Sequence, residues 1–324
     1  MMRIFGASAM AAALVLAGGV QARAEAWPTR PITLVVGFAA GGASDGTARI
    51  LAERLQEELK QPVVVENRPG AGTMIATNYV SRAAPDGYTF LVGSSGHTIN
   101  PGVHKQVRYD PVKDFASVTL VGSLLHVLVV RNELPAQNVA ELIALAKAKP
   151  GEITYASVGA GTSTHLEAEL FAAMAGIQLT HIPYKGSAPA LIDLTAGRVD
   201  MMFDAVASSL PLVNGGRIRA LGVVSAQRSA LLPNVPTIAE SGLPGYEAMP
   251  WFGILAPAGI DPAIVEKMNV AIQKIIAEPS VKERFAKLGA DIIGYGPEKF
   301  SAFIAVDLKK WADIARRANI QIAE

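Results

Sequence analysis

Strand-like and helix-like patterns alternate along this chain, and the alternation runs through twice. In the first half, residues 32–38 form an apolar, β-branched run that predicts a buried strand, and after Asp45 the apolar side chains recur at 3.6-residue spacing. Residues 63–65 and 88–92 continue the pattern as strands, with a second amphipathic stretch over 73–82 between them. The order strand, helix, strand, helix, strand predicts a parallel sheet flanked by helices.

The second half repeats this pattern, which indicates a second domain. Further strands are predicted over 128–130, 153–157, 179–182, 199–203 and 220–224. More than one hydrophobic core is also the default expectation for a chain of about 300 residues. We expect the chain to cross between the two domains near residues 120–126 and again near residues 245–252. Two such crossings would form a two-strand hinge and return the helical C-terminal segment to the first domain. We therefore expect a two-domain α/β fold with mostly parallel sheets, in which domain 1 holds residues 27–124 and 250–324 and domain 2 holds 125–249.

The first 26 residues have the features of a secretory signal peptide. Arg3 provides a positive start, an uncharged alanine-rich run extends to Gly19, and small residues two apart end at Ala24 and Ala26. Roughly 16 apolar residues are short for a ~30 Å hydrocarbon core, so a membrane anchor is the less favoured alternative. We expect cleavage after Ala24 or Ala26 and a mature protein in the periplasm.

Composition removes several classes of function. Lys and Arg total 29 against 28 Asp and Glu, which implies no basic face for nucleic acid. There is no cysteine, so disulfides, thiolate metal ligands and a cysteine nucleophile are excluded. The five histidines lack the spacing of a metal site, since residues 100–102 (Asn-Pro-Gly) are expected to break any helix joining His97 and His104. No metal or cofactor is expected.

Three polar loops, each following a predicted strand, are the candidate binding elements. Residues 38–45 and 157–165 combine glycines and hydroxyls just before a helix, and residues 93–97 follow the third strand. Open α/β sheets bind ligands at such strand ends. Glycines permit close backbone approach, and a helix start offers unpaired N–H groups and a positive dipole end, so an anion site is predicted. The alternative is a tight turn in which Ser44 or Asp45 caps the helix.

Enzyme motifs are incomplete in these loops. No Gly-x-x-x-x-Gly-Lys-Ser/Thr string occurs, and the Gly-x-Gly at 159–161 lacks the third glycine of a dinucleotide fingerprint. In residues 93–97, His97 replaces the last glycine of a nucleophile elbow. Lys185 is the only basic residue near the loops that is a candidate for contact with an anion. An enzyme on this fold would need a catalytic acid or base, and Asp204 with Lys185 is the only candidate pair. We expect a binding protein rather than an enzyme.

Several strings of residues are distinctive in combination. They are Trp27-Pro28-Thr29-Arg30-Pro31-Ile32, the 38–45 loop with Ala48-Arg49, Glu66-Asn67-Arg68-Pro69-Gly70-Ala71-Gly72, Ala84-Pro85-Asp86-Gly87-Tyr88-Thr89, Tyr155-Ala156-Ser157, Gly161-Thr162, His181-Ile182-Pro183-Tyr184-Lys185-Gly186 and Asp200-Met201-Met202-Phe203-Asp204. In these strings the chain resembles the receptors of tripartite tricarboxylate transporters, also called the Bug family of periplasmic solute-binding proteins. The resemblance runs from Trp27 to nearly the C-terminus. The chain departs from the family at Ala40 and Thr73, where proline and glycine are frequent.

The resemblance implies a type II-like Venus-flytrap fold whose two glycine-rich loops grip a carboxylate, partly through ordered water, and deliver it to a membrane permease. It also implies that the regions of Tyr184 and Asp204 face the cleft. Dicarboxylates, tricarboxylates, aromatic acids and acidic amino acids all fit, and a ligand sensor for a signalling partner would have the same cleft. We expect a monomer. The candidate ligand-binding residues are Phe38, Gly41, Gly42, Ala43, Ser44, Ser94, Ser95, His97, Ser157, Gly159, Gly161, Thr162, Ser163, Tyr184 and Asp204.

Export can be tested on the protein itself. Mass spectrometry of periplasmic material should give a chain that begins at Glu25 or Trp27, because signal peptidase cuts after small residues two apart. An intact Met1 recovered from the membrane fraction would contradict the prediction.

Overall fold

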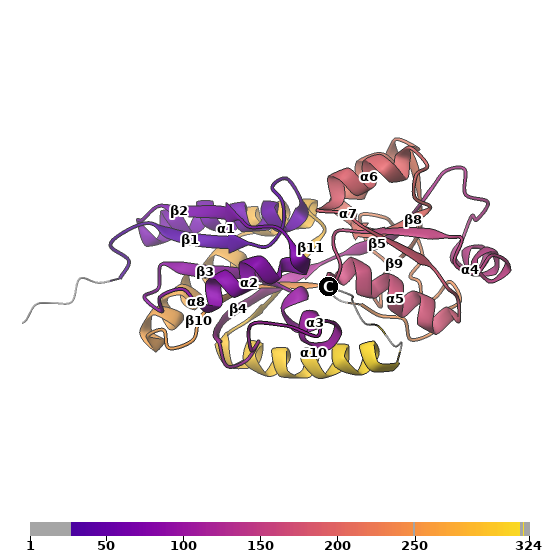
Figure 1. Cartoon of the computed structure of the whole chain (residues 1–324). Helices are drawn as coiled ribbons and strands as arrows, with labels where there is room; N and C mark the ends of the chain where they lie inside the picture. The colour runs from indigo at the N-terminus through magenta and orange to yellow at the C-terminus, as the bar shows by residue number, and fades with distance from the viewer. Residues whose placement is uncertain (1–26, 249, 318–319, 321–324) are drawn as a thin grey trace, which may run out of the picture.

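The computed structural model describes residues 27–248, 250–317 and 320. The predicted signal peptide, residues 1–26, lies outside this part. Two lobes lie side by side, and the chain passes between them (Figure 1). Within the described ranges, no helix is both long enough and apolar enough to cross a membrane.

The first domain is built on a six-stranded sheet in the order β11-β4-β10-β3-β1-β2. Its strands are β1 (Ile32–Val36), β2 (Val63–Asn67), β3 (Thr89–Ser94), β4 (Phe115–Leu124), β10 (Trp251–Pro257) and β11 (Ala290–Tyr295). Its helical segments are α1 (Ala43–Leu59), the 3-10 turn η1 (Ala71–Thr73), α2 (Met74–Ser81), α3 (Gly96–Val103), α8 (Pro262–Ala277), α9 (Pro279–Lys287) and α10 (Pro297–Arg317).

The second domain is built on a five-stranded sheet in the order β7-β6-β8-β5-β9. Its strands are β5 (His126–Arg131), β6 (Thr154–Ser157), β7 (Thr180–Pro183), β8 (Met201–Ala205) and β9 (Ile218–Val223). Its helices are α4 (Val139–Ala148), α5 (Ser163–Ala175), α6 (Ser187–Thr195) and α7 (Val206–Asn214). Side chains of α4 and α5 share one buried cluster, and those of α6 and α7 share another, so each face of the sheet is covered.

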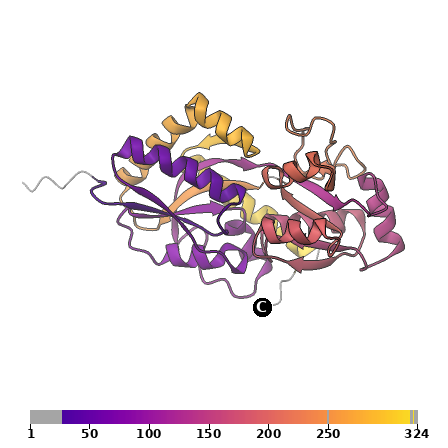
Figure 2. The same cartoon turned by 90° about the horizontal axis from the view of Figure 1, so that it is seen from above.

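The apolar run of β1 is explained by cover on both faces of the first sheet (Figure 2). Leu34 and Val36 pack in one cluster with α1 and α8, whereas Val35 packs on the opposite face with α2 and α10. Successive strand residues point to opposite faces, so a strand covered on both sides needs apolar side chains at every position. Each such buried side chain contributes about 1.5–3 kcal/mol relative to exposure.

The observed fold confirms the two-domain α/β class but differs in strand direction. Both sheets are mixed rather than mostly parallel, because β10 is antiparallel to β3 and β4, and β5 is antiparallel to β8 and β9. The reason is the path between the domains. β4 continues into β5 with only Leu125 between them, and β10 brings the chain back into the first sheet. A strand that leaves a sheet and a neighbour that returns to it run in opposite directions.

The expectation that residues 100–102 break a helix is wrong. α3 contains Pro101 in its last turn. Proline has no N–H to donate to the carbonyl oxygen of His97 four residues earlier. The hydroxyl of Tyr109 donates to that oxygen at 3.3 Å, so the carbonyl keeps a partner and the helix continues.

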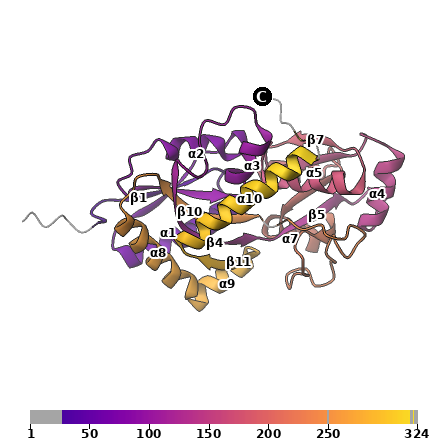
Figure 3. The same cartoon turned by 90° about the horizontal axis from the view of Figure 1, so that it is seen from below.

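The C-terminal helix α10 lies across the molecule and reaches from the first domain towards α5 of the second (Figure 3). A small buried cluster joins Ile99 and Val103 of α3, Leu166 of α5, and Trp311 and Ala315 of α10. The two domains therefore share apolar contact beyond the crossing strands.

A buried carboxylate fastens α10 to the first domain. Asp307 accepts a hydrogen bond from the hydroxyl of Thr98 at 2.6 Å and one from the indole N–H of Trp251 at 2.8 Å. These bonds join α10, α3 and β10. Burial raises the pKa of Asp307, although the two donors act in the opposite direction.

Replacing this carboxylate should destabilise the first domain. Asp307→Ala leaves the Trp251 N–H without an acceptor and leaves the Thr98 hydroxyl only the Ser95 carbonyl oxygen at 3.0 Å, which should lower the free energy of unfolding by about 2–4 kcal/mol. Asp313→Ala on the same helix is the matched control, because its ion pair with Arg316 is exposed and should contribute less than about 1 kcal/mol. Urea unfolding measures both values. Equal losses would show that Asp307 has no special role.

Candidate functional site

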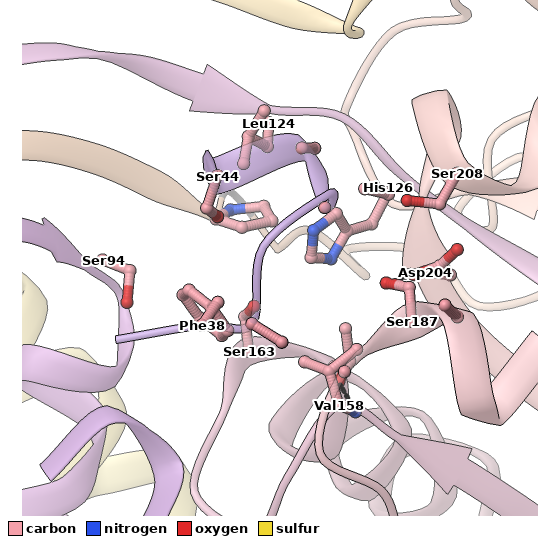
Figure 4. Close-up of a pocket in the computed structure, with 18 of the residues that line it drawn as sticks. Phe38, Ser44, Ser94, Leu124, His126, Val158, Ser163, Ser187, Asp204 and Ser208 are labelled. Carbon is pink, nitrogen blue, oxygen red and sulfur yellow. Dashed lines mark hydrogen bonds between the residues drawn. The ribbon is translucent and has the colours of Figure 1, made fainter. Parts of the chain in front are cut away.

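A cavity of about 330 Å³ lies between the two sheets, within the size range of small-molecule sites. Figure 4 shows Phe38, Ser44 and Ser94 on its first-domain side and Ser187 and Asp204 on its second-domain side. The lining residues are Phe38, Ala39, Ala40, Gly41, Gly42, Ala43, Ser44, Ser94, Ser95, Leu124, His126, Val158, Ser163, Thr164, Gly186, Ser187, Ala188, Pro189, Leu191, Asp204, Ala205, Ser208, Pro250 and Trp251. None of the lining residues among the described ranges is a lysine or an arginine.

The first-domain loop turns sharply from β1 into α1. Gly41 has a φ of +88°, a left-handed conformation that glycine adopts without strain. Asp45 reaches back from the first helical turn and accepts the Gly41 N–H at 2.9 Å, while Asn67 and Arg49 each donate to the same carboxylate at 2.9 Å. Burial alone would raise the pKa of Asp45, but the three hydrogen bonds outweigh it and lower the pKa. Asp45 therefore fixes the loop and keeps its charge out of the cavity wall.

Five helices begin at the cavity wall with N-termini that no side chain caps. Their N-cap residues are Gly42 of α1, Ser95 of α3, Thr162 of α5, Gly186 of α6 and Ala205 of α7. The first N–H groups of a helix have no partner within it, and the helix dipole places partial positive charge there. Among the helices that begin away from the cavity, α4 and α8 are capped by Asn138 and Asp261, whereas α2 and α9 also lack a side-chain cap. The wall thus offers backbone donors from both domains to one anion.

The second-domain side of the cavity contains a buried acid. Asp204 in β8 is fully buried and accepts hydrogen bonds from the hydroxyls of Ser187 at 2.6 Å and Ser209 at 2.8 Å. Burial raises the pKa of Asp204, and the two hydroxyls and the charge of His126 offset only part of this effect. The carboxylate is therefore part of a hydrogen-bonded wall rather than an isolated charge.

His126, the first residue of β5, lies in the wall beside Asp204. Its ring Nδ1 is 2.9 Å from each carboxylate oxygen of Glu167, which is fully buried in α5. Burial would lower the pKa of His126, but the charge and hydrogen bond of Glu167, with the charge of Asp204, outweigh it and raise the pKa. Sequence analysis missed this pair, because a single histidine and a glutamate 41 positions apart form no local pattern.

The structure brings most of the predicted first-domain residues together at this cavity and divides the second-domain ones. Those that line the cavity are Phe38, Gly41, Gly42, Ala43, Ser44, Ser94, Ser95, Ser163 and Asp204. Those placed elsewhere are His97, Ser157, Gly159, Gly161, Thr162 and Tyr184. Several residues lie outside the cavity because their polar atoms form hydrogen bonds with other parts of the protein.

Two of the residues outside the cavity are buried in the domains. His97 donates from Nε2 to the carbonyl oxygen of Pro111 at 2.9 Å and packs against the rings of Tyr109 and Phe115. Burial lowers the pKa of His97 to about 4, so the ring is neutral near pH 7. The Ser157 hydroxyl pairs with Nε2 of His181 at 2.6 Å.

Three others line a neighbouring cavity of about 550 Å³ that shares the side chains of Phe38 and Val158 with the first. They are Gly159, Thr162 and Tyr184, and Lys185 and Arg108 lie in the same wall. All three residues already have hydrogen-bond partners within the protein, and the Gly159 N–H donates to the Ser157 hydroxyl at 3.2 Å. The Thr162 hydroxyl donates to the carbonyl oxygen of Gly159 at 2.6 Å, and the Tyr184 hydroxyl donates to Asp193 at 2.7 Å.

Gly161 is placed where the two domains touch. A Cβ atom at this position would collide with the Asn100 side chain of α3 and lie 2.8 Å from Nε2 of His104. Its φ of +78° also favours glycine. The glycine in the second-domain loop therefore permits contact between the domains, in place of the ligand approach that its position in the sequence suggests.

Some cavity-lining residues that sequence analysis did not predict also follow the ends of strands, where open α/β sheets bind ligands. Ser187 follows β7 and Gly186 at the start of α6, the same arrangement as the two loops that were singled out. Ser208 lies in the first turn of α7, after β8. Trp251 has no such signal, because it reaches the cavity only when β10 returns from the second domain. In the described residues, no three His, Asp or Glu side chains are arranged to hold a metal ion.

Known proteins with similar sequences and structures agree with this architecture. The family model described as the tripartite tricarboxylate transporter family receptor matches residues 47–320. Protein BugT of Bordetella pertussis is 38% identical over 301 residues, which are 92% of each chain. The R. palustris structure "Rpa4515 with adipate" has a TM-score of 0.87 and 39% identity, covering 91% of this chain and 99% of that one. MatC from Rhodopseudomonas palustris "with bound malate" has a TM-score of 0.84 and 31% identity, covering 89% and 99%.

Proposed function

The chain belongs to the tripartite tricarboxylate transporter receptor family, and we propose that it captures a small organic acid with two carboxylate groups in the cavity between its domains. One observation carries the proposal. Uncapped helix N-termini of both domains begin at a single cavity whose lining, in the described residues, has no lysine or arginine. Backbone donors and helix dipoles are then the main source of attraction for a carboxylate. The two similar structures, described with adipate and with bound malate, favour the same ligand class.

Such contacts are strong enough to account for useful affinity. Each helix terminus contributes roughly 0.3–1 kcal/mol, and up to ~2 when partly buried. Each hydrogen bond to a charged group contributes about 1.5–3 kcal/mol. A few of these together supply the roughly 8 kcal/mol that corresponds to micromolar binding. The apolar wall formed by Phe38, Leu124, Val158 and Leu191 suits the carbon chain between the two acidic groups.

We further propose that the receptor works in the periplasm and hands its ligand to a tripartite permease without altering it. The family match and the similar binding proteins support this role. In this proposal, residues 27–124 with 250–324 move as one domain and 125–249 as the other, bending at Leu125 and near residues 245–252. The neighbouring cavity with Lys185 and Arg108 then lies outside the principal ligand contacts.

Calorimetry and thermal unfolding with a panel of adipate, succinate, malate and citrate test the proposal. An acid present at 100 times its Kd should raise the free energy of unfolding by about 2.7 kcal/mol. The acid should be recovered chemically unchanged after incubation. The absence of binding by every acid of the panel would contradict the proposed ligand class, and a converted acid would contradict binding without turnover.

A graded pair of substitutions at Gly42 tests backbone recognition. Gly42 has extended backbone, with φ −85° and ψ 172°, and a Cβ there would meet only the Ala39 carbonyl oxygen, at 4.0 Å. Neither Gly42→Ala nor Gly42→Val should therefore disturb folding. The valine should block approach to the α1 N–H groups and weaken binding at least tenfold, about 1.4 kcal/mol, while the alanine loses less. Unchanged affinity in both variants would show that this loop is only a turn.

A matched pair at Gly161 and Gly176 tests domain closure. Both glycines have positive φ, +78° and +62°, so alanine causes similar backbone strain at each. Only Gly161→Ala introduces a clash with the other domain, because nothing lies within 4 Å of a Cβ at Gly176. Small-angle scattering should show that ligand reduces the radius of gyration of wild type and of Gly176→Ala but not of Gly161→Ala. Equal compaction in all three proteins would remove Gly161 from the closing contact.

A further inference from the structure

His126 is a polar side chain in the cavity wall with one ring nitrogen still available. Only 5% of the residue is exposed, yet it lines the cavity. Nδ1 is used by Glu167 at 2.9 Å, and the structure records no hydrogen bond of Nε2 with any described residue. Figure 4 shows the ring pointing into the cavity, between Asp204 and Ser208 on one side and Phe38 and Ser44 on the other. A ring nitrogen that has no protein partner and belongs to a cavity-lining residue is available to bond a ligand atom.

Glu167 determines what His126 offers to that ligand atom. A carboxylate only accepts hydrogen bonds when ionised, so Nδ1 must carry the proton in the bond with Glu167. Nε2 is then an acceptor in the neutral ring and a donor in the charged ring. Glu167 faces His126 from α5 and Asp204 faces it from β8, and both acids favour the charged form. His126 is consequently the one side chain in the described cavity wall that can become a cationic donor.

Building on the proposed receptor function, we infer that His126 is the residue that recognises the second carboxylate of the ligand. The first carboxylate lies at the N-terminus of α1, and the charged His126 ring donates from Nε2 to the second. Glu167 is its positioning residue, because it fixes the ring orientation and keeps the proton on Nδ1. The pair makes the receptor selective for acids with two carboxylates over acids of equal length with one.

Matched acids separate this role from a structural one. Adipate and hexanoate have the same carbon chain and differ in the second carboxylate, as do succinate and butyrate. In His126→Gln, adipate and succinate should each bind at least tenfold more weakly, whereas hexanoate and butyrate should change less than twofold. A merely structural role would weaken all four acids equally, and that result would overturn the inference.

The pH profile of adipate binding gives a second readout. His126 is charged below its pKa, so affinity should be greatest at a pH that leaves both adipate carboxylates ionised and His126 protonated, and it should fall as the pH rises through the raised pKa of His126. In Glu167→Gln only the charge of Asp204 still raises the pKa of His126, so the fall should begin at lower pH. The fall should be absent in His126→Gln. If the fall in affinity persists unchanged in His126→Gln, it is caused by the titration of Asp204, and the inference is wrong.

Tyr246→Phe is the matched control for disturbance around the pair. The Tyr246 hydroxyl donates to the backbone carbonyl oxygen of Glu167 at 3.0 Å and touches neither charged group of the pair. This variant should keep both the adipate preference and the wild-type pH profile, and loss of either would overturn the assignment to His126 and Glu167. If wild type binds none of the four acids, the receptor proposal fails and the inference fails with it. Binding of all four acids with no preference in wild type overturns the inference alone.

Discussion

The unpaired N–H groups at the start of each helix are the constraint on which the site depends. Every α-helix begins with such groups, and a buried donor without a partner is costly. In this protein, α1, α5, α6 and α7 direct uncapped N-termini at one cavity between two domains. A bound carboxylate would satisfy groups from both domains at once. In the proposed function, ligand binding and domain closure would therefore follow from the same helix N–H groups, apart from that of Val206 in α7, which already donates to the carbonyl oxygen of Leu125.

The path of the chain makes this arrangement possible. β4 runs into β5 and β10 returns from the second domain, so two adjacent crossings connect sheets that otherwise fold separately. The cluster around Leu166 and Trp311 adds a contact between α5 and α10 that any opening motion must rearrange. Asp307 holds α10 on the first domain through its bonds to α3 and β10. The two crossing strands and the contact between α5 and α10 lie on different parts of the boundary between the domains.

The sequence predicted the cavity lining best where the whole signal lies in one loop. Residues 38–44 line the cavity, and they were predicted because a strand end, glycines and a helix start are adjacent in the chain. The same signal over 157–165 was ambiguous, since the Thr162 hydroxyl and the Gly161 backbone are used for the loop itself and for the contact between domains. His126 and Glu167 could not be found this way, because their partnership exists only when β5 and α5 pack together.

The central claim is that one acid is held by helix N-termini of both domains within the cavity that contains Phe38 and Asp204. A crystal structure of the mature receptor with adipate tests it most directly. The account predicts one carboxylate at the N–H groups that follow Gly42, the carbon chain against Phe38, and the other carboxylate on the second-domain wall at His126. Adipate held by Arg108 and Lys185 in the neighbouring cavity, with the helix N-termini left without an anion, would contradict the account.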